Sequence, residues 1–141
     1  MKQHIVIDTS VLISALLSRR GASYLLLSLI DDKRFDIHLS VPLVIEYESV
    51  AKRKSRSIGL THAEIDDIID YLCSVGRAHR VHFLWRPFLR DPGDDLVLEV
   101  AVEAECEYIV THNVRHFAEV DRFGVKVVTP AEFLRIIGAI P

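Results

Sequence analysis

Short apolar, β-branched runs alternate with longer segments of helical periodicity from one end of this chain to the other. The runs expected as strands are 4–7, 36–39, 81–84, 108–111 and 125–128, and the segments expected as helices are 11–16, 22–30, 40–56, 61–76, 94–105 and 129–137. Strands that alternate with helices favour a sheet whose faces are both covered by helices. The sequence therefore predicts a three-layer α/β/α fold with a central, mainly parallel β-sheet.

The length of 141 residues fits a single domain, 1–141, with a core of its own. Half of the residues are apolar and 26% are charged, which is typical of a soluble globular protein. No apolar run reaches the roughly 20 residues that a membrane span needs, and no cleavable signal pattern is present. We therefore expect a cytoplasmic protein with no membrane association.

Cys73 and Cys106 are isolated from each other and from any Cys/His cluster with zinc spacing. Free cysteine usually packs as a small apolar residue, so two buried thiols are expected rather than a redox or zinc site.

Asp8 directly follows the first apolar run, and Thr9 and Ser10 separate it from the helical pattern. In open α/β sheets, ligands bind in the crevice outside the carboxyl ends of the strands. Asp8 is therefore expected to face a ligand site.

Other acids are candidates to meet Asp8 at that edge of the sheet. Glu46 has no cation three or four residues away, whereas Glu48 precedes Lys52 by four residues and suits an ordinary surface ion pair. Asp94 and Asp95 stand together at the expected start of a helix, where one Asp suffices as the cap. The second carboxylate indicates a metal site or another specialised pocket.

The segment from Thr111 to Asn113 follows the expected strand 108–111. Taken alone it is a turn, because Thr and Asn are common turn residues, but its position predicts that it shares the crevice with Asp8. Carboxylates that converge repel one another unless a cation holds them, and a set of oxygen ligands favours Mg²⁺ or Mn²⁺ over zinc. Such an ion activates water for hydrolysis of a phosphodiester or phosphate ester.

These motifs, in this order, resemble those of the PIN domain family, and the similarity extends over essentially the whole chain. The matching stretches are Asp8-Thr9-Ser10, Glu46, Arg90-Asp91-Pro92-Gly93-Asp94-Asp95 with Leu98 and Ala101, and 108–113 followed by His116-Phe117. The similarity is closest to the VapC-like toxin components of toxin-antitoxin systems.

The resemblance implies an Mg²⁺- or Mn²⁺-dependent endoribonuclease that is often a homodimer and is held in check by a small antitoxin. Carried over to this sequence, Asp8 and Glu46 would be metal ligands and Asp95 the third acid, with Asp94 a close alternative. Asn113 departs from the pattern, because many members carry Asp there. This departure brings a second, tightly held ion into question.

Several residues are expected to contact the RNA substrate. Hydroxyl groups of Thr9, Ser10 and Thr111 could support Asp8 or a phosphate, and Arg90 and Arg115 flank the acids in loops, as do Arg86 and His116. The basic run 52–56 suits either a helix C-terminus or phosphate binding. Trp85 could stack a base, although a Trp at a strand end is more often a core residue.

Alternatives from other classes compete with the ribonuclease. A catalytically weak RNA-binding or regulatory relative, which acts through a partner, is favoured by Asn113 and by the net charge of −3. A phosphoacceptor receiver domain fits poorly, because the expected acidic pair does not precede the first strand and no Asp ends the second or third strand. A haloacid-dehalogenase-like phosphatase would need an acid at position 10, where Ser10 stands.

Overall fold

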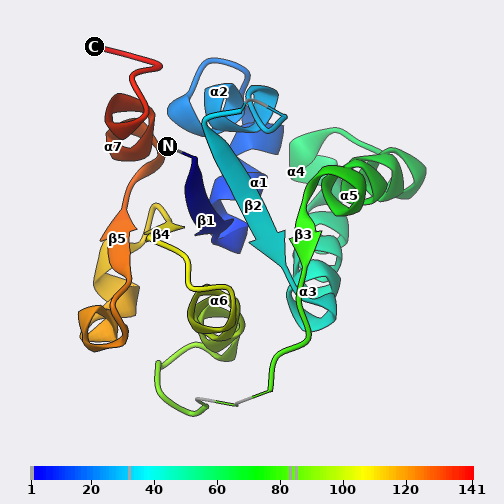
Figure 1. The fold of residues 1–141 in the computed structure, drawn as a ribbon. Helices are drawn as coiled ribbons and strands as arrows, with labels where there is room; N and C mark the ends of the chain where they lie inside the picture. Colours follow the sequence, from blue (N-terminus) through cyan, green and yellow to red (C-terminus); the bar gives the residue numbers. More distant parts are fainter. Residues whose placement is uncertain (1, 32, 83, 85) are drawn as a thin grey trace.

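A computed structural model of the chain describes residues 2–31, 33–82, 84 and 86–141. The described residues form one five-stranded sheet in the order β3-β2-β1-β4-β5, and every neighbouring pair is parallel (Figure 1). The strands are β1 (Gln3–Ile7), β2 (Phe35–Leu39), β3 (Arg77–Ala78), β4 (Tyr108–Val110) and β5 (Lys126–Val128). The predicted α/β class is confirmed, and the sheet is wholly rather than mainly parallel.

Helical segments connect all of the strands. They are α1 (Thr9–Leu17), α2 (Ala22–Ser28), α3 (Val41–Arg53), α4 (Ser55–Ile58), α5 (His62–Val75), α6 (Pro92–Glu103), the short 3₁₀ turns η1 (Val114–Phe117) and η2 (Val120–Phe123), and α7 (Pro130–Ile136). Capping boxes start α5 at Thr61 and α7 at Thr129, as the sequence predicts.

The strand order changes direction at β1. The chain moves from β1 to β2 and β3 on one side, and then returns to β4 and β5 on the other side. Because parallel crossovers are right-handed, this reversal places α6 on the face opposite to α1 and α3. Ligand sites of open α/β sheets lie at such a reversal, here between the carboxyl ends of β1 and β4.

The core is packed on both faces of the central strands. Helix α6 contacts β1, β2 and β4, and its Val97, Leu98, Val100 and Ala101 are completely buried. On the other face, the Phe133 ring of α7 packs edge-on against Phe35 at a centroid distance of 5.4 Å. The register pairs Ile7 of β1 with Val110 of β4, so the residues that follow them emerge side by side.

The third strand differs from the prediction. Strand β3 is the exposed pair Arg77–Ala78, whereas residues 81, 82 and 84 belong to no strand, and Phe83 lies outside the described residues. The prediction followed apolar character, but this short edge strand is held by pairing His38 with Arg77 and Leu39 with Ala78. The interpretation of Trp85 also falls outside the described residues.

Three smaller differences concern helix boundaries and a thiol. The segment 40–56 divides into α3 and α4 around Lys54, and α6 is capped by Asp91 rather than by Asp94 or Asp95. Cys106 is buried as predicted, but the prediction for Cys73 is wrong, because this residue is exposed. Within the described ranges, no helix combines the length and apolar character needed to cross a membrane.

Candidate active site

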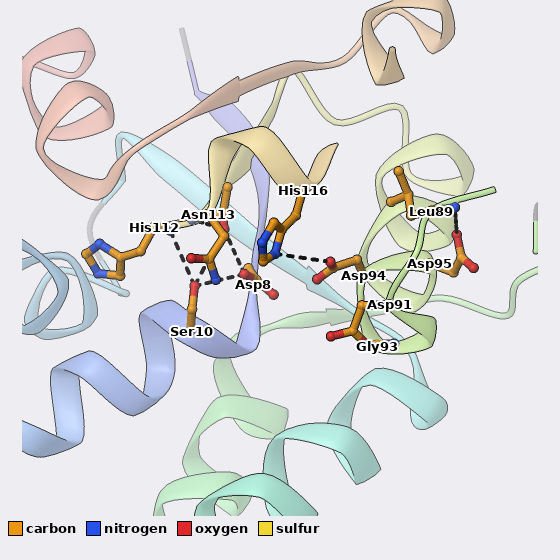
Figure 2. A network of polar contacts seen from close by, with 11 residues as sticks. Asp8, Ser10, Leu89, Asp91, Gly93, Asp94, Asp95, His112, Asn113 and His116 are labelled. Carbon is orange, nitrogen blue, oxygen red and sulfur yellow. Dashed lines mark hydrogen bonds and ion pairs between the residues drawn. The ribbon is translucent and has the colours of Figure 1, made fainter. Parts of the chain in front are cut away.

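Asp8 lies at the reversal of strand order, immediately after β1, and is only 4% exposed. Its backbone N–H donates to the carbonyl of Val110 at 2.9 Å, which continues the β1–β4 pairing by one residue. Its Oδ2 accepts hydrogen bonds from Ser10 Oγ at 2.8 Å and from Thr111 Oγ1 at 2.7 Å (Figure 2). Both hydroxyls hold one carboxylate oxygen of Asp8, and within the described part of the chain its Oδ1 accepts no hydrogen bond.

Glu46 is placed by the residue that follows it in α3. Tyr47 is completely buried, and its hydroxyl donates to the carbonyl of Ile7 at the end of β1. Burial raises the pKa of Tyr47 well above its usual value, and the charge of Asp8 raises it further. Tyr47 therefore fixes α3 against β1 and holds Glu46 on the side where Asp8 emerges.

The first turn of α6 brings further acids to the same place. Asp91 caps the helix by accepting the N–H of Gly93 at 2.8 Å, with Pro92 in the first turn. A Cβ on Gly93 would lie 3.0 Å from Glu46 Oε1, so the missing side chain lets α3 and α6 approach closely at this point. Asp94 follows on the inner side of the turn and is 6% exposed.

The adjacent aspartates of α6 point in different directions (Figure 2). Asp94 lies toward Asp8, and its Oδ2 is 3.7 Å from His116 Nδ1. Asp95 turns toward the preceding loop, where its Oδ1 accepts the N–H groups of Phe88 at 3.3 Å and Leu89 at 2.9 Å. Asp95 is thus engaged in holding that loop, and Asp94 is the one that shares a pocket with Asp8 and Glu46.

A pocket of about 540 Å³ collects these side chains. Its polar lining includes the carboxylates of Asp8, Glu46, Asp91 and Asp94, the amide of Asn113, the hydroxyls of Thr9 and Ser10, and the cations Arg53 and Lys54. Asn113 is exposed, and its backbone N–H donates to Thr111 Oγ1 at 2.9 Å, which places it beside the Asp8 hydroxyl partners.

The electrostatics of the pocket are dominated by mutual repulsion. Burial first, and then the charges of Asp8, Asp91, Asp95 and Glu46, raise the pKa of Asp94 to about 7. Carboxylates in this situation either retain a proton or bind a cation. The acids therefore form a site at which positive charge is stabilised near neutral pH.

The donor set fits a hard divalent ion. Several carboxylates and one amide line the same pocket, and no sulfur or imidazole ligand is needed for Mg²⁺ or Mn²⁺. No three Asp, Glu, His or Cys side chains of the described residues already converge as a finished ligand cage. Ion binding would thus draw the acid side chains together by rotamer changes.

Arg90 and Arg115 do not line this pocket. They line an adjacent cavity, which shares Asp91, Asp94 and His116 with the first one. Sequence reasoning missed Asp91 as a member of the acid group, because a tight Asp-Pro-Gly turn accounts for it without further function. Arg53 and Lys54 belonged to a basic run whose role the sequence left open.

Comparison with known proteins places the geometry in context. The crystal structure of VapBC2 from Rickettsia felis, bound to a DNA fragment from the promoter, contains a similar chain with a TM-score of 0.60. The alignment covers 89% of this chain and 98% of that one at 13% identity, so the likeness concerns the fold alone. No curated protein sequence is significantly similar to the chain. The family model described as PIN domain matches residues 4–115, which include every acid of the pocket, and the chain therefore belongs to the PIN domain family.

Proposed function

We propose that this protein is a ribonuclease that uses Mg²⁺ or Mn²⁺ to hydrolyse RNA phosphodiester bonds. The observation that carries the proposal is the convergence of Asp8, Glu46, Asp91 and Asp94 on one pocket at the reversal of strand order. Members of the family are typically metal-dependent nucleases. Asp8 and Asp94 are both buried here, and a cation would relieve the repulsion between them.

In the proposed mechanism, Asp8, Glu46 and Asp94 would hold the ion, and Asn113 would supply a neutral oxygen. The ion supplies a more acidic water and positive charge for the phosphoryl group. Ser10 and Thr111 keep the Asp8 carboxylate in one orientation through its Oδ2. Asp95, which the family resemblance favours as the third acid, supports the site indirectly by holding the loop at Phe88 and Leu89.

The cations at the rim suit a polyanionic substrate despite the net charge of −3. Arg53 and Lys54 line the pocket beside the acids, where they can hold phosphates on one side of the bond that is cleaved. His116 lines the same pocket, with its Nδ1 3.7 Å from Asp94 Oδ2, and is the candidate to donate a proton to the leaving oxygen.

The biological role that we propose is that of a toxin restrained by a small antitoxin. We also propose that the protein is cytoplasmic, that it forms a homodimer, and that each subunit is a single domain, 1–141. This role is supported by the likeness to a chain of VapBC2, a toxin-antitoxin complex, 98% of which aligns with this protein. To test this role, the protein is copurified with the product of an adjacent small gene. We expect the two proteins to form a complex and the complex to cleave RNA less than the free protein does.

A second candidate is a catalytically weak RNA-binding protein. It is favoured by Asn113, whose amide lines the pocket where a fourth carboxylate of the family pattern would stand.

Cleavage of a mixed RNA pool with and without Mn²⁺ separates the two candidates. We expect metal-dependent cleavage that Asp8→Asn abolishes while the circular dichroism spectrum stays unchanged. Glu48→Gln is the matched control, because Glu48 pairs with Lys52 at 3.4 Å outside the pocket. RNA binding without cleavage in the wild type would support the binding protein instead.

A further inference from the structure

A second cavity of about 500 Å³ lies on the other side of Asp94 and His116 from Asp8. In Figure 2, Asp94 and His116 stand between Asp8 and Leu89, which belongs to this cavity. The cavity is lined by Phe88, Leu89, Arg90, Asp91, Asp94, Arg115, His116, Ala118 and Glu119. Its volume is in the range of ordinary ligand pockets.

One wall of the cavity is apolar and held in place from behind. The backbone N–H groups of Phe88 and Leu89 donate to the buried carboxylate of Asp95, which fixes the position of both residues. The Phe88 ring also packs edge-on against Phe123 at 5.3 Å and lies 5.9 Å from the Arg122 guanidinium. Because this wall is already ordered, a flat apolar group can bind against it with little loss of conformational entropy in the protein.

The polar part of the cavity carries cations without partners. Arg90 and Arg115 are exposed, and neither makes an ion pair or a side-chain hydrogen bond with the described residues. By contrast, Arg86 on the same loop donates to Glu99 at 2.7 Å. Asp91 and Asp94 line both cavities, and each cavity has its own pair of cations, Arg53 with Lys54 in the first and Arg90 with Arg115 in the second.

Glu119 adds an unpaired acceptor to this cavity. It adopts a left-handed backbone conformation with φ 67° at the start of η2, which is uncommon for a residue other than glycine. Its side chain has no hydrogen-bond partner among the described residues. A carboxylate beside an apolar wall can accept hydrogen bonds from the N–H groups on the pairing edge of a base.

We propose that this second cavity binds the nucleotide next to the scissile phosphate, with its base against Phe88 and Leu89 and its phosphate on Arg90 and Arg115. The subsite rests on the proposed RNA substrate. Glu119 favours a base whose pairing edge donates hydrogen bonds, and guanine fits best because it offers two adjacent donors. The substrate is single-stranded at this point, because a paired base cannot enter a pocket.

Equilibrium binding tests the subsite separately from catalysis. The probe is a fluorescent single-stranded hexauridylate, or the same RNA with one guanosine, and the protein carries Asp8→Asn so that it does not cleave. We expect the guanosine RNA to bind more tightly and Glu119→Gln to remove that preference. Adding Arg90→Ala and Arg115→Ala together should weaken RNA binding about tenfold or more. It should also lower the magnitude of the slope of log binding constant against log salt concentration by about 2.

Arg80→Ala is the matched control, because Arg80 is exposed and lines a different cavity. The subsite is overturned if Arg80→Ala weakens RNA binding as much as the double arginine variant does, or if the double arginine variant keeps the full RNA affinity. The role of Glu119 is overturned if both RNAs bind with equal affinity. Failure of the nuclease would appear separately, as wild-type protein that does not cleave while the arginine variant still loses RNA affinity.

Discussion

Asp94→Asn should stabilise the metal-free protein, although it alters a buried polar residue. The pKa of Asp94 is raised from 3.8 to about 7, first by burial and then by the charge of Asp8 and other acids. The folded protein therefore holds this proton more tightly than the unfolded chain does. The contribution of Asp94 to stability is therefore greatest at low pH and falls as the pH rises from about 4 through about 7.

The size of the effect follows from the pKa difference. About three pKa units correspond to at most about 4 kcal/mol above pH 7. Although Asp94 is only 6% exposed, it lines an open pocket, so solvent in that pocket screens part of this energy. Asn keeps the shape of the side chain but loses its charge and its contact with His116, so we expect a net gain of about 1–3 kcal/mol at pH 8.

The assay is urea unfolding with EDTA at pH 5 and pH 8. The stability gap between Asp94→Asn and the wild type should widen with pH, and Mn²⁺ should stabilise the wild type more than the variant. Asp95→Asn is the control: it keeps an acceptor for the loop N–H groups, and we expect no gain at pH 8. Destabilisation of the metal-free protein by Asp94→Asn at pH 8, or a stability gap that does not change with pH, would contradict this prediction.

Three further predictions concern other residues. Burial first, and then neighbouring histidines, lower the pKa of His38 from 6.5 to about 4, so the contribution of His38 to stability should be lost as the pH falls from about 6.5 to about 4. In pH-dependent unfolding, His38→Gln should reduce this loss of unfolding free energy by up to about 3 kcal/mol. An unchanged pH dependence would contradict the prediction. Gly93→Ala should displace Glu46 and weaken Mn²⁺ binding measured by calorimetry, whereas Gly21→Ala, with open space around its Cβ, should not. Tyr47→Phe should cost about 1–3 kcal/mol of unfolding free energy, because it leaves the carbonyl at the end of β1 without its partner, and a neutral effect would show that this bond does not anchor α3.

The spacing of apolar residues along the chain is enough to predict most of the fold. Ile5 and Ile7 identify a buried strand, and once the sheet is parallel the positions of Asp8 and Thr111 at neighbouring strand ends follow. Strand β3 escaped prediction because Arg77 and Ala78 have no apolar pattern and are held by pairing with β2 and by the ion pair of Arg77 with Asp36. The apolar residues just after it were the stronger local signal.

The choice between Asp94 and Asp95 depends on where α6 begins. Successive residues turn by about 100° around a helix, so neighbours face different directions. With Asp91 as the cap, Asp94 faces the pocket and Asp95 faces the loop at Leu89. Several Asp residues in succession could cap this helix, so the sequence does not determine its rotation. Glu46 was easier to find, because no neighbouring cation explained it.

Calorimetric titration with Mn²⁺ is the most direct test of the central claim, which is that the acids after β1 and at the start of α6 hold a divalent ion. We predict saturable binding to the wild type and affinity reduced at least about tenfold in Asp8→Asn, because one ligand charge is lost while the fold is kept. Equal affinity in both proteins, or no binding to the folded wild type, would contradict the account.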